Sequence, residues 1–97
     1  MRVISQDGYT DIPYEDFVFS ATDDWKIKVA KDVVYTTGQG KLRVIAEYSS
    51  REKVLKVMEL LREAYLKFAH ATNDDSFHTF FDNPKVFRFP ADDEVKV

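Results

Sequence analysis

The chain has 97 residues, of which 44% are apolar, and 17 acidic side chains against 14 basic ones give it a formal charge of −3. A chain of this size predicts a single domain, residues 1–97, with a small core. Duplex DNA binders are usually basic because they neutralise phosphates, so duplex DNA is not an expected partner. Without cysteine, disulfides and thiolate metal sites are excluded.

The first elements read as a β-hairpin followed by another strand. Residues 2–5 predict a short strand, and Asp7-Gly8 supplies the positive φ that a hairpin turn requires. Residues 9–12 should return beside it, and Pro13 interrupts that strand or places it on a sheet edge. Residues 16–21 then continue as a further strand.

The clearest strand pattern follows. Trp25, Ile27 and Val29 alternate with Lys26 and Lys28. This period of two is typical of a strand with one buried and one wet face, so the pattern predicts that Trp25 faces the core.

Further β-rich sequence completes the first half. Residues 33–36 predict a strand and residues 37–41 a glycine loop. The inward face of the strand after the loop is predicted to consist of Leu42, Val44, Ala46 and Tyr48. The first half is therefore expected to be an antiparallel meander.

A long helix is predicted next. Ser49 and Glu52 fit a capping box, and the helix should fade across residues 69–75. Leu55 and Leu66, with Leu60 near the flank, widen its apolar arc beyond what one small sheet covers. This surplus predicts a second contact surface, and we expect a homo-dimer or higher homo-oligomer. The buried stripe is predicted to comprise Val54, Val57, Met58, Leu61, Ala64, Tyr65 and Phe68.

Five of the eight phenylalanines lie in residues 77–89, around one arginine, Arg88. So short a segment cannot bury these rings against itself, so they need a partner surface. Residues 77–81 fit a short helix or a loop, and residues 86–89 predict a last strand. The fold class expected is α+β: an N-terminal antiparallel meander packed on one long helix, with a short C-terminal strand.

Three arginines are candidates for binding an anion. Arg88 should point away from Phe87 and Phe89, either as a solvated strand residue or as a clamp for phosphate oxygens. Arg43 offers the same chemistry on the earlier strand, and Arg51 lies in the first helical turn, where exposed amides favour anions.

The other candidate ligand contacts have ordinary structural readings beside them. Phe77, with Phe80 and Phe81, either packs in a core or interface or stacks on a ligand. Asn83 either bonds a base edge or forms its turn before Pro84. The loop containing Thr37 and Gly38 could wrap a phosphate, but it lacks the ending of a P-loop and is better read as a hairpin turn.

No pattern in the chain indicates catalysis. His70 and His78 are eight residues apart, a spacing that fits surface histidines better than metal ligands. No carboxylate pair lies in an apolar context, and no nucleophile is paired with a base. We therefore expect neither an enzyme nor a metal site nor a cofactor.

Several segments of the chain carry a resemblance to known proteins: residues 1–8, Ile12-Pro13-Tyr14-Glu15 with Phe17-Val18-Phe19-Ser20, Phe87-Arg88-Phe89-Pro90 with Asp92-Asp93-Glu94-Val95, and loosely residues 46–53. These segments resemble small proteins of phages and prophages of Gram-positive bacteria. Within that group the chain is similar to the first described Thoeris anti-defence family, whose members sequester cyclic ADP-ribose signals made by bacterial TIR-domain enzymes. The chain is short for that family between the long helix and the last strand.

The resemblance implies an oligomeric sponge that binds a cyclic nucleotide without cleaving it, by aromatic stacking and arginine contacts to phosphates. Some members also take up cyclic oligonucleotides at a separate site. On this view Phe77 stacks on the base and Arg88, with Arg43 or Arg51, holds the pyrophosphate. The expected location is the cytoplasm of the bacterial host, because residues 1–5 lack a secretion signal and no apolar run is long enough to span a membrane.

A different class of function fits the same residues. The exposed aromatics would serve equally well in a phage interaction protein that docks on a host protein and inhibits it. The two classes differ in an observable way, because only a nucleotide sponge is stabilised against heat by small nucleotides.

Overall fold

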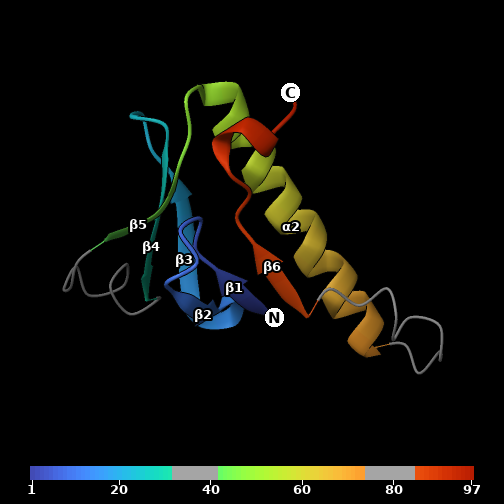
Figure 1. Cartoon of the computed structure of the whole chain (residues 1–97). Coiled ribbons are helices and arrows are strands. Elements are labelled where there is room, and N and C mark those ends of the chain that lie inside the picture. The colour runs from blue at the N-terminus through green and yellow to red at the C-terminus, as the bar shows by residue number, and fades with distance from the viewer. Residues whose placement is uncertain (32–41, 74–84) are drawn as a thin grey trace.

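The computed structural model describes residues 1–31, 42–73 and 85–97. Two three-stranded sheets, with strand orders β2-β1-β6 and β3-β4-β5, accompany one long helix, α2 (Arg51–Asn73). Figure 1 shows α2 running along one side of the molecule, with β6 between it and β1. The strands are β1 (Arg2–Ile4), β2 (Asp11–Pro13), β3 (Phe17–Ala21), β4 (Lys26–Lys31), β5 (Arg43–Glu47) and β6 (Val86–Arg88); η1 (Tyr14–Asp16) and η2 (Asp92–Glu94) are short 3-10 helices. The α+β class, with a meander on one long helix and a short C-terminal strand, is confirmed.

The first sheet joins the two ends of the chain. β1 and β2 form the predicted antiparallel hairpin, and Gly8 has the expected positive φ of 82° in its turn. Pro13 lies in β2, an edge strand, where its missing N–H costs no ladder hydrogen bond. β6 pairs with β1 in parallel, with Phe87 opposite Val3. The last strand is thus part of the first sheet.

The second sheet departs from the predicted pattern in β5. Ile27 pairs with Ala46 and Lys28 pairs with Val44, so Ile45 is an extra, bulged residue. A bulge shifts the alternation of side chains by one position. Ile45 and Ala46 are therefore both buried, and the prediction that Val44 faces inward is wrong, since its side chain is 51% exposed. Leu42 is half exposed as well, whereas the predicted inward positions of Ala46 and Tyr48 are confirmed.

The helix begins one residue later than predicted, at Arg51. Ser50, and not Ser49, caps it, since the Ser50 Oγ accepts a hydrogen bond from the Lys53 amide at 3.3 Å. The Ser49 amide is bound by the Asp92 carboxylate at 2.7 Å, so the predicted capping box of Ser49 and Glu52 is wrong. The apolar stripe is confirmed in full: Val54, Val57 and Leu61 are buried, and Met58, Ala64, Tyr65 and Phe68 pack against the core.

Aromatic rings join the helix to the sheets. The Tyr14 ring stacks on Tyr65 of α2 with centroids 4.2 Å apart, and on Phe19 of β3 at 5.4 Å. Phe87 and Phe89 meet edge to face at 5.3 Å, and Phe89 is almost fully buried. Arg88 is exposed, as expected for a residue that alternates with two inward rings.

Gln6 ties the two sheets together. Its backbone amide donates to the Ile45 carbonyl at 3.0 Å. Its side chain donates to the Glu47 carbonyl at 2.9 Å and accepts from the Glu47 amide at 2.9 Å, so it imitates a neighbouring strand at the β5 edge. The same side-chain nitrogen also donates to the Pro90 carbonyl at 3.2 Å.

Replacing Gln6 should therefore destabilise the domain. We expect Gln6→Ala to lower the free energy of unfolding by about 2 kcal/mol, because it removes three hydrogen bonds that each contribute roughly 0.5–1.5 kcal/mol. Gln6→Glu keeps the acceptor for Glu47 but loses the donor, so its loss should be intermediate. Urea denaturation measures both, and an unchanged midpoint for Gln6→Ala would show that water replaces these bonds at no cost.

The acidic segment near the C-terminus is fixed to the start of α2. Besides the Ser49 amide, the Asp92 carboxylate contacts the Lys53 ammonium at 3.5 Å, and Val95 is buried in the core. The hydrogen bond from the Ser49 backbone, followed by attraction to Lys53, lowers the pKa of Asp92 below its usual value. The negative charge on Asp92 therefore favours the folded state.

This contact makes the stability of the folded domain decrease as the pH is lowered. Because the pKa of Asp92 is lower folded than unfolded, its contribution is complete at neutral pH and is lost as the pH falls below about 4. Asp92→Asn should lower Tm at pH 7 and have little effect at pH 2. The control is Asp93→Asn, a change at an exposed neighbour. An equal Tm loss for Asp92→Asn at both pH values would assign the effect to packing.

Candidate functional site

The connection between β3 and β4 is a tight turn from Thr22 to Lys26. The Trp25 amide donates to the Thr22 carbonyl at 3.2 Å, and the Thr22 amide donates to the Lys26 carbonyl at 2.9 Å. These bonds define a three-residue hairpin loop, Asp23 to Trp25, of the kind whose last residue adopts the left-handed conformation. That residue is Trp25, with φ of 63°.

Tryptophan is an unusual residue at such a position. Glycine adopts positive φ without cost, whereas a bulky side chain is strained there by roughly 1–3 kcal/mol. The Trp25 side chain is also 46% exposed, so the prediction that it faces the core with Ile27 and Val29 is wrong. The strand begins at Lys26, after the chain has turned, and its buried residues are Ile27, Val29 and Ala30. The turn therefore carries a tryptophan whose backbone is strained and whose indole is only partly packed against the protein.

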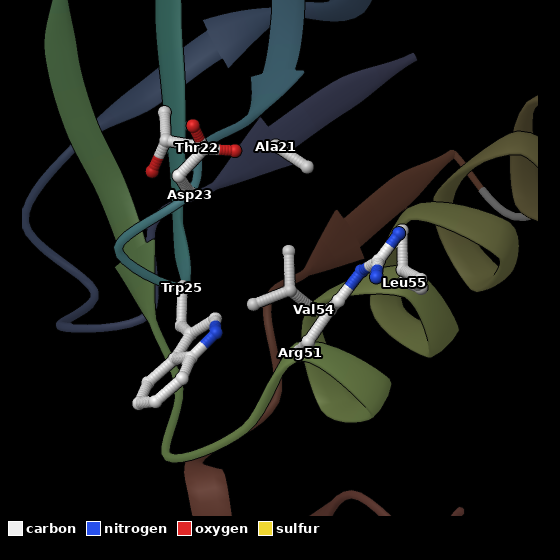
Figure 2. A pocket seen from close by; sticks show the side chains of 7 residues that line it. All are labelled: Ala21, Thr22, Asp23, Trp25, Arg51, Val54 and Leu55. Atoms are coloured by element: carbon white, nitrogen blue, oxygen red, sulfur yellow. The ribbon is translucent and has the colours of Figure 1, made fainter.

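A backbone hydrogen bond places this indole beside the helix. The Trp25 carbonyl accepts from the Tyr48 amide at 3.0 Å, and Arg51 follows only three residues later, in the first turn of α2. Between turn and helix lies a hollow of about 360 Å³. Figure 2 shows the side chains that line it, with the Trp25 indole and the Arg51 side chain on separate walls. Its lining residues are Ala21, Thr22, Asp23, Trp25, Arg51, Val54 and Leu55.

The two acids of the turn differ in their partners. Asp24 accepts from the Thr22 hydroxyl and contacts the Lys26 ammonium at 3.3 Å, and these hydrogen bonds lower its pKa. Asp23 and Arg51, in contrast, have no hydrogen bond or ion pair from their side chains within the described ranges. Among the described residues, the hollow thus presents a carboxylate and a guanidinium without side-chain partners, together with an indole.

The comparisons with known proteins give no match. No family model, curated protein or solved structure matches this chain.

The predicted arginines do not share one site. Arg51 lines the hollow beside Trp25. Arg88 lines a second hollow of about 490 Å³ with Gln6, Phe89 and Glu94, next to Gly8, where a Cβ would lie 3.4 Å from the Arg88 Nη2. Arg43 is exposed on β5 and lines neither. A single clamp made of all three arginines is therefore absent from the described part of the chain.

The remaining predicted contacts belong to segments outside the described residues. Phe77 and Asn83, together with Phe80 and Phe81, lie outside the described residues, as do Thr37 and Gly38. His78 lies outside them too, while His70 is exposed on α2. Within the three described ranges there is no group of acidic or histidine side chains that could hold a metal ion, and no helix long and apolar enough to cross a bilayer.

Sequence reasoning missed Trp25 and Asp23. The alternation with Ile27 and Val29 assigned Trp25 to a strand, which hid its position in the turn. A signal was present, since Thr22-Asp23-Asp24 is followed by tryptophan where such a loop usually has glycine. Reading the turn before the strand would have identified the mismatch.

Proposed function

We propose that this chain is a non-catalytic phage anti-defence protein that sequesters a cyclic nucleotide signal in the hollow between Trp25 and Arg51. The observation that carries the proposal is the strained, half-exposed Trp25 in the same hollow as Arg51, whose side chain has no hydrogen bond or ion pair within the described residues. A bulky side chain in the left-handed region costs stability, so a contribution outside the fold accounts for its presence.

The indole suits the flat part of a nucleotide. Every base has a π-face, and stacking of a base on an aromatic side chain contributes about 1–3 kcal/mol to binding. The Trp25 backbone is held on both sides, by Thr22 and by Tyr48, so the point from which the indole projects is fixed before a ligand arrives. Such preorganisation lowers the entropy cost of binding.

The guanidinium suits the phosphates. Arg51 can donate two parallel hydrogen bonds to phosphate oxygens, and it projects from the first turn of α2, where the helix dipole also favours negative charge. The buried Val54 and the half-exposed Leu55 add apolar surface to the lining of the hollow. A base on Trp25 and a phosphate on Arg51 would together occupy the hollow.

Sequestration requires affinity and no chemistry. A stoichiometric trap needs a dissociation constant well below the signal concentration, on the order of nanomolar. The resemblance to the Thoeris anti-defence family supports a cyclic ADP-ribose isomer or a cyclic oligonucleotide as the ligand, bound by a homo-oligomer in the cytoplasm of the bacterial host.

A thermal-shift scan against cyclic ADP-ribose isomers and cyclic di- and trinucleotides tests this function. Ligand at about 1,000 times its dissociation constant stabilises by roughly 4 kcal/mol, which raises Tm by more than 10 °C in a domain of this size. The ligand should be recovered unchanged after the protein is denatured. Recovery of a cleaved product would contradict sequestration, and the absence of any shift would contradict nucleotide binding.

A phage protein that binds and inhibits a host protein is the second candidate. Leu55 and Leu66 are 48% and 66% exposed and lie three helical turns apart on the same side of α2. Such a pair suits an apolar partner surface. This function predicts no thermal shift with nucleotides and loss of the host partner in Leu66→Asp.

A further inference from the structure

The geometry points to Asp23 as the residue that makes the hollow select ribose hydroxyl groups. This inference rests on the proposed nucleotide binding and adds a contact that neither stacking nor phosphate binding provides. Asp23 lines the same hollow as Trp25 and Arg51, and Figure 2 labels all three around it.

The pairing within the turn leaves Asp23 available. Asp24 is held by the Thr22 hydroxyl and by Lys26, so its carboxylate supports the turn. Asp23 is exposed and makes no side-chain hydrogen bond or ion pair within the described ranges, although it is adjacent in sequence. A carboxylate accepts hydrogen bonds and donates none when ionised, so its natural ligand contact is a hydroxyl or an amino group.

The order of groups around the hollow fits a ribonucleotide. In nucleotide sites of other folds, a carboxylate accepts from the ribose 2′-hydroxyl while phosphates bind at a helix start. Here Asp23 and Trp25 come from the turn, and Arg51 comes from the start of α2. A ligand with its base on Trp25 and a phosphate on Arg51 would have its ribose between them, in the hollow that Asp23 also lines.

The alternative effect of Asp23 is repulsion. A carboxylate near an anionic ligand weakens binding by charge alone, whatever the sugar. The two roles predict different effects on affinity when the Asp23 carboxylate is removed. If Asp23 accepts a hydroxyl hydrogen bond, its removal weakens the binding of ribonucleotides and leaves the binding of deoxynucleotides unchanged. If Asp23 only repels the ligand, its removal strengthens the binding of both.

Matched ribo and deoxy ligands distinguish these cases. The probes are cyclic di-AMP with cyclic di-dAMP and ADP with 2′-deoxy-ADP, and fluorescence of Trp25, the only tryptophan, reports binding. Wild-type protein should bind the ribo form about 10-fold more tightly, since a hydrogen bond to a charged group contributes enough for one decade. Asp23→Ala should abolish this ratio by weakening the ribo form alone.

The controls separate failure of this inference from failure of the proposed function. Asp24→Asn should keep the ratio, because its carboxylate is engaged in the turn. Equal binding of ribo and deoxy forms by wild type, or tighter binding of both by Asp23→Ala, overturns the role of Asp23 and leaves nucleotide binding intact. No fluorescence response to either pair contradicts both.

Discussion

Phe89→Ala should lower the free energy of unfolding by about 4 kcal/mol, within the range of roughly 3–5 kcal/mol for deleting a buried ring. Phe89 is 1% exposed, packs edge to face on Phe87 and lies 6.3 Å from the Phe19 ring. The change leaves a cavity where the first sheet, the second sheet and the C-terminal segment meet. Chemical denaturation should show the loss in the free energy of unfolding. Thermal denaturation should show a Tm lower by roughly 20 °C for a domain of this size.

Neighbouring positions on β6 supply matched controls. Phe87 is only partly buried and Val86 is 52% exposed, so Phe87→Ala should cost less than Phe89→Ala, and Val86→Ala should cost little. A loss below about 1 kcal/mol for Phe89→Ala would mean that the core closes without this ring. The C-terminal segment would then be a tail on the domain.

Arg51→Ala and Trp25→Ala should each weaken nucleotide binding by roughly 10- to 100-fold. The first removes hydrogen bonds between charged groups, of about 1.5–3 kcal/mol, and the second removes a base stack of similar size. Calorimetric titration with the nucleotide that gives a thermal shift measures both. The double variant should bind too weakly to be detected.

Stability measurements guard against unfolding as the cause. Arg62→Ala removes an exposed arginine of α2 that does not line the hollow, so it should keep full affinity. Trp25→Gly should be more stable than Trp25→Ala by about 1 kcal/mol, because glycine tolerates the positive φ, yet it should bind equally weakly. If the order of stability is reversed, Trp25 is not strained, and its presence in the turn needs no function outside the fold.

Much of the fold was predictable because its signals are local and periodic. The buried stripe from Val54 to Phe68 follows from helical spacing, and the turn at Gly8 follows from Asp-Gly chemistry. The parallel pairing of β6 with β1 was not, since it joins residues more than 80 positions apart. The bulge at Ile45 was missed because it reverses the alternation within a single strand.

The candidate site was predictable only in part. Arg51 was identified from its place at the helix start, but its neighbours come from a turn that the strand pattern concealed. Trp25 combines strong β-propensity with a left-handed backbone, and propensity alone assigns it to the strand. Asp23 and Asp24 look alike in sequence, and only the contacts of Asp24 with Thr22 and Lys26 distinguish them.

The most direct test of the proposed site is an NMR titration that follows the indole N–H of Trp25. The chain has one tryptophan, so this signal needs no separation from others. We predict that the nucleotide identified by the thermal-shift scan moves the Trp25 indole signal and the Arg51 side-chain signal together, with saturation at one ligand per hollow. A nucleotide that binds while both signals stay unchanged, with the shifts gathered around Arg88 or elsewhere, would contradict the assignment of this hollow.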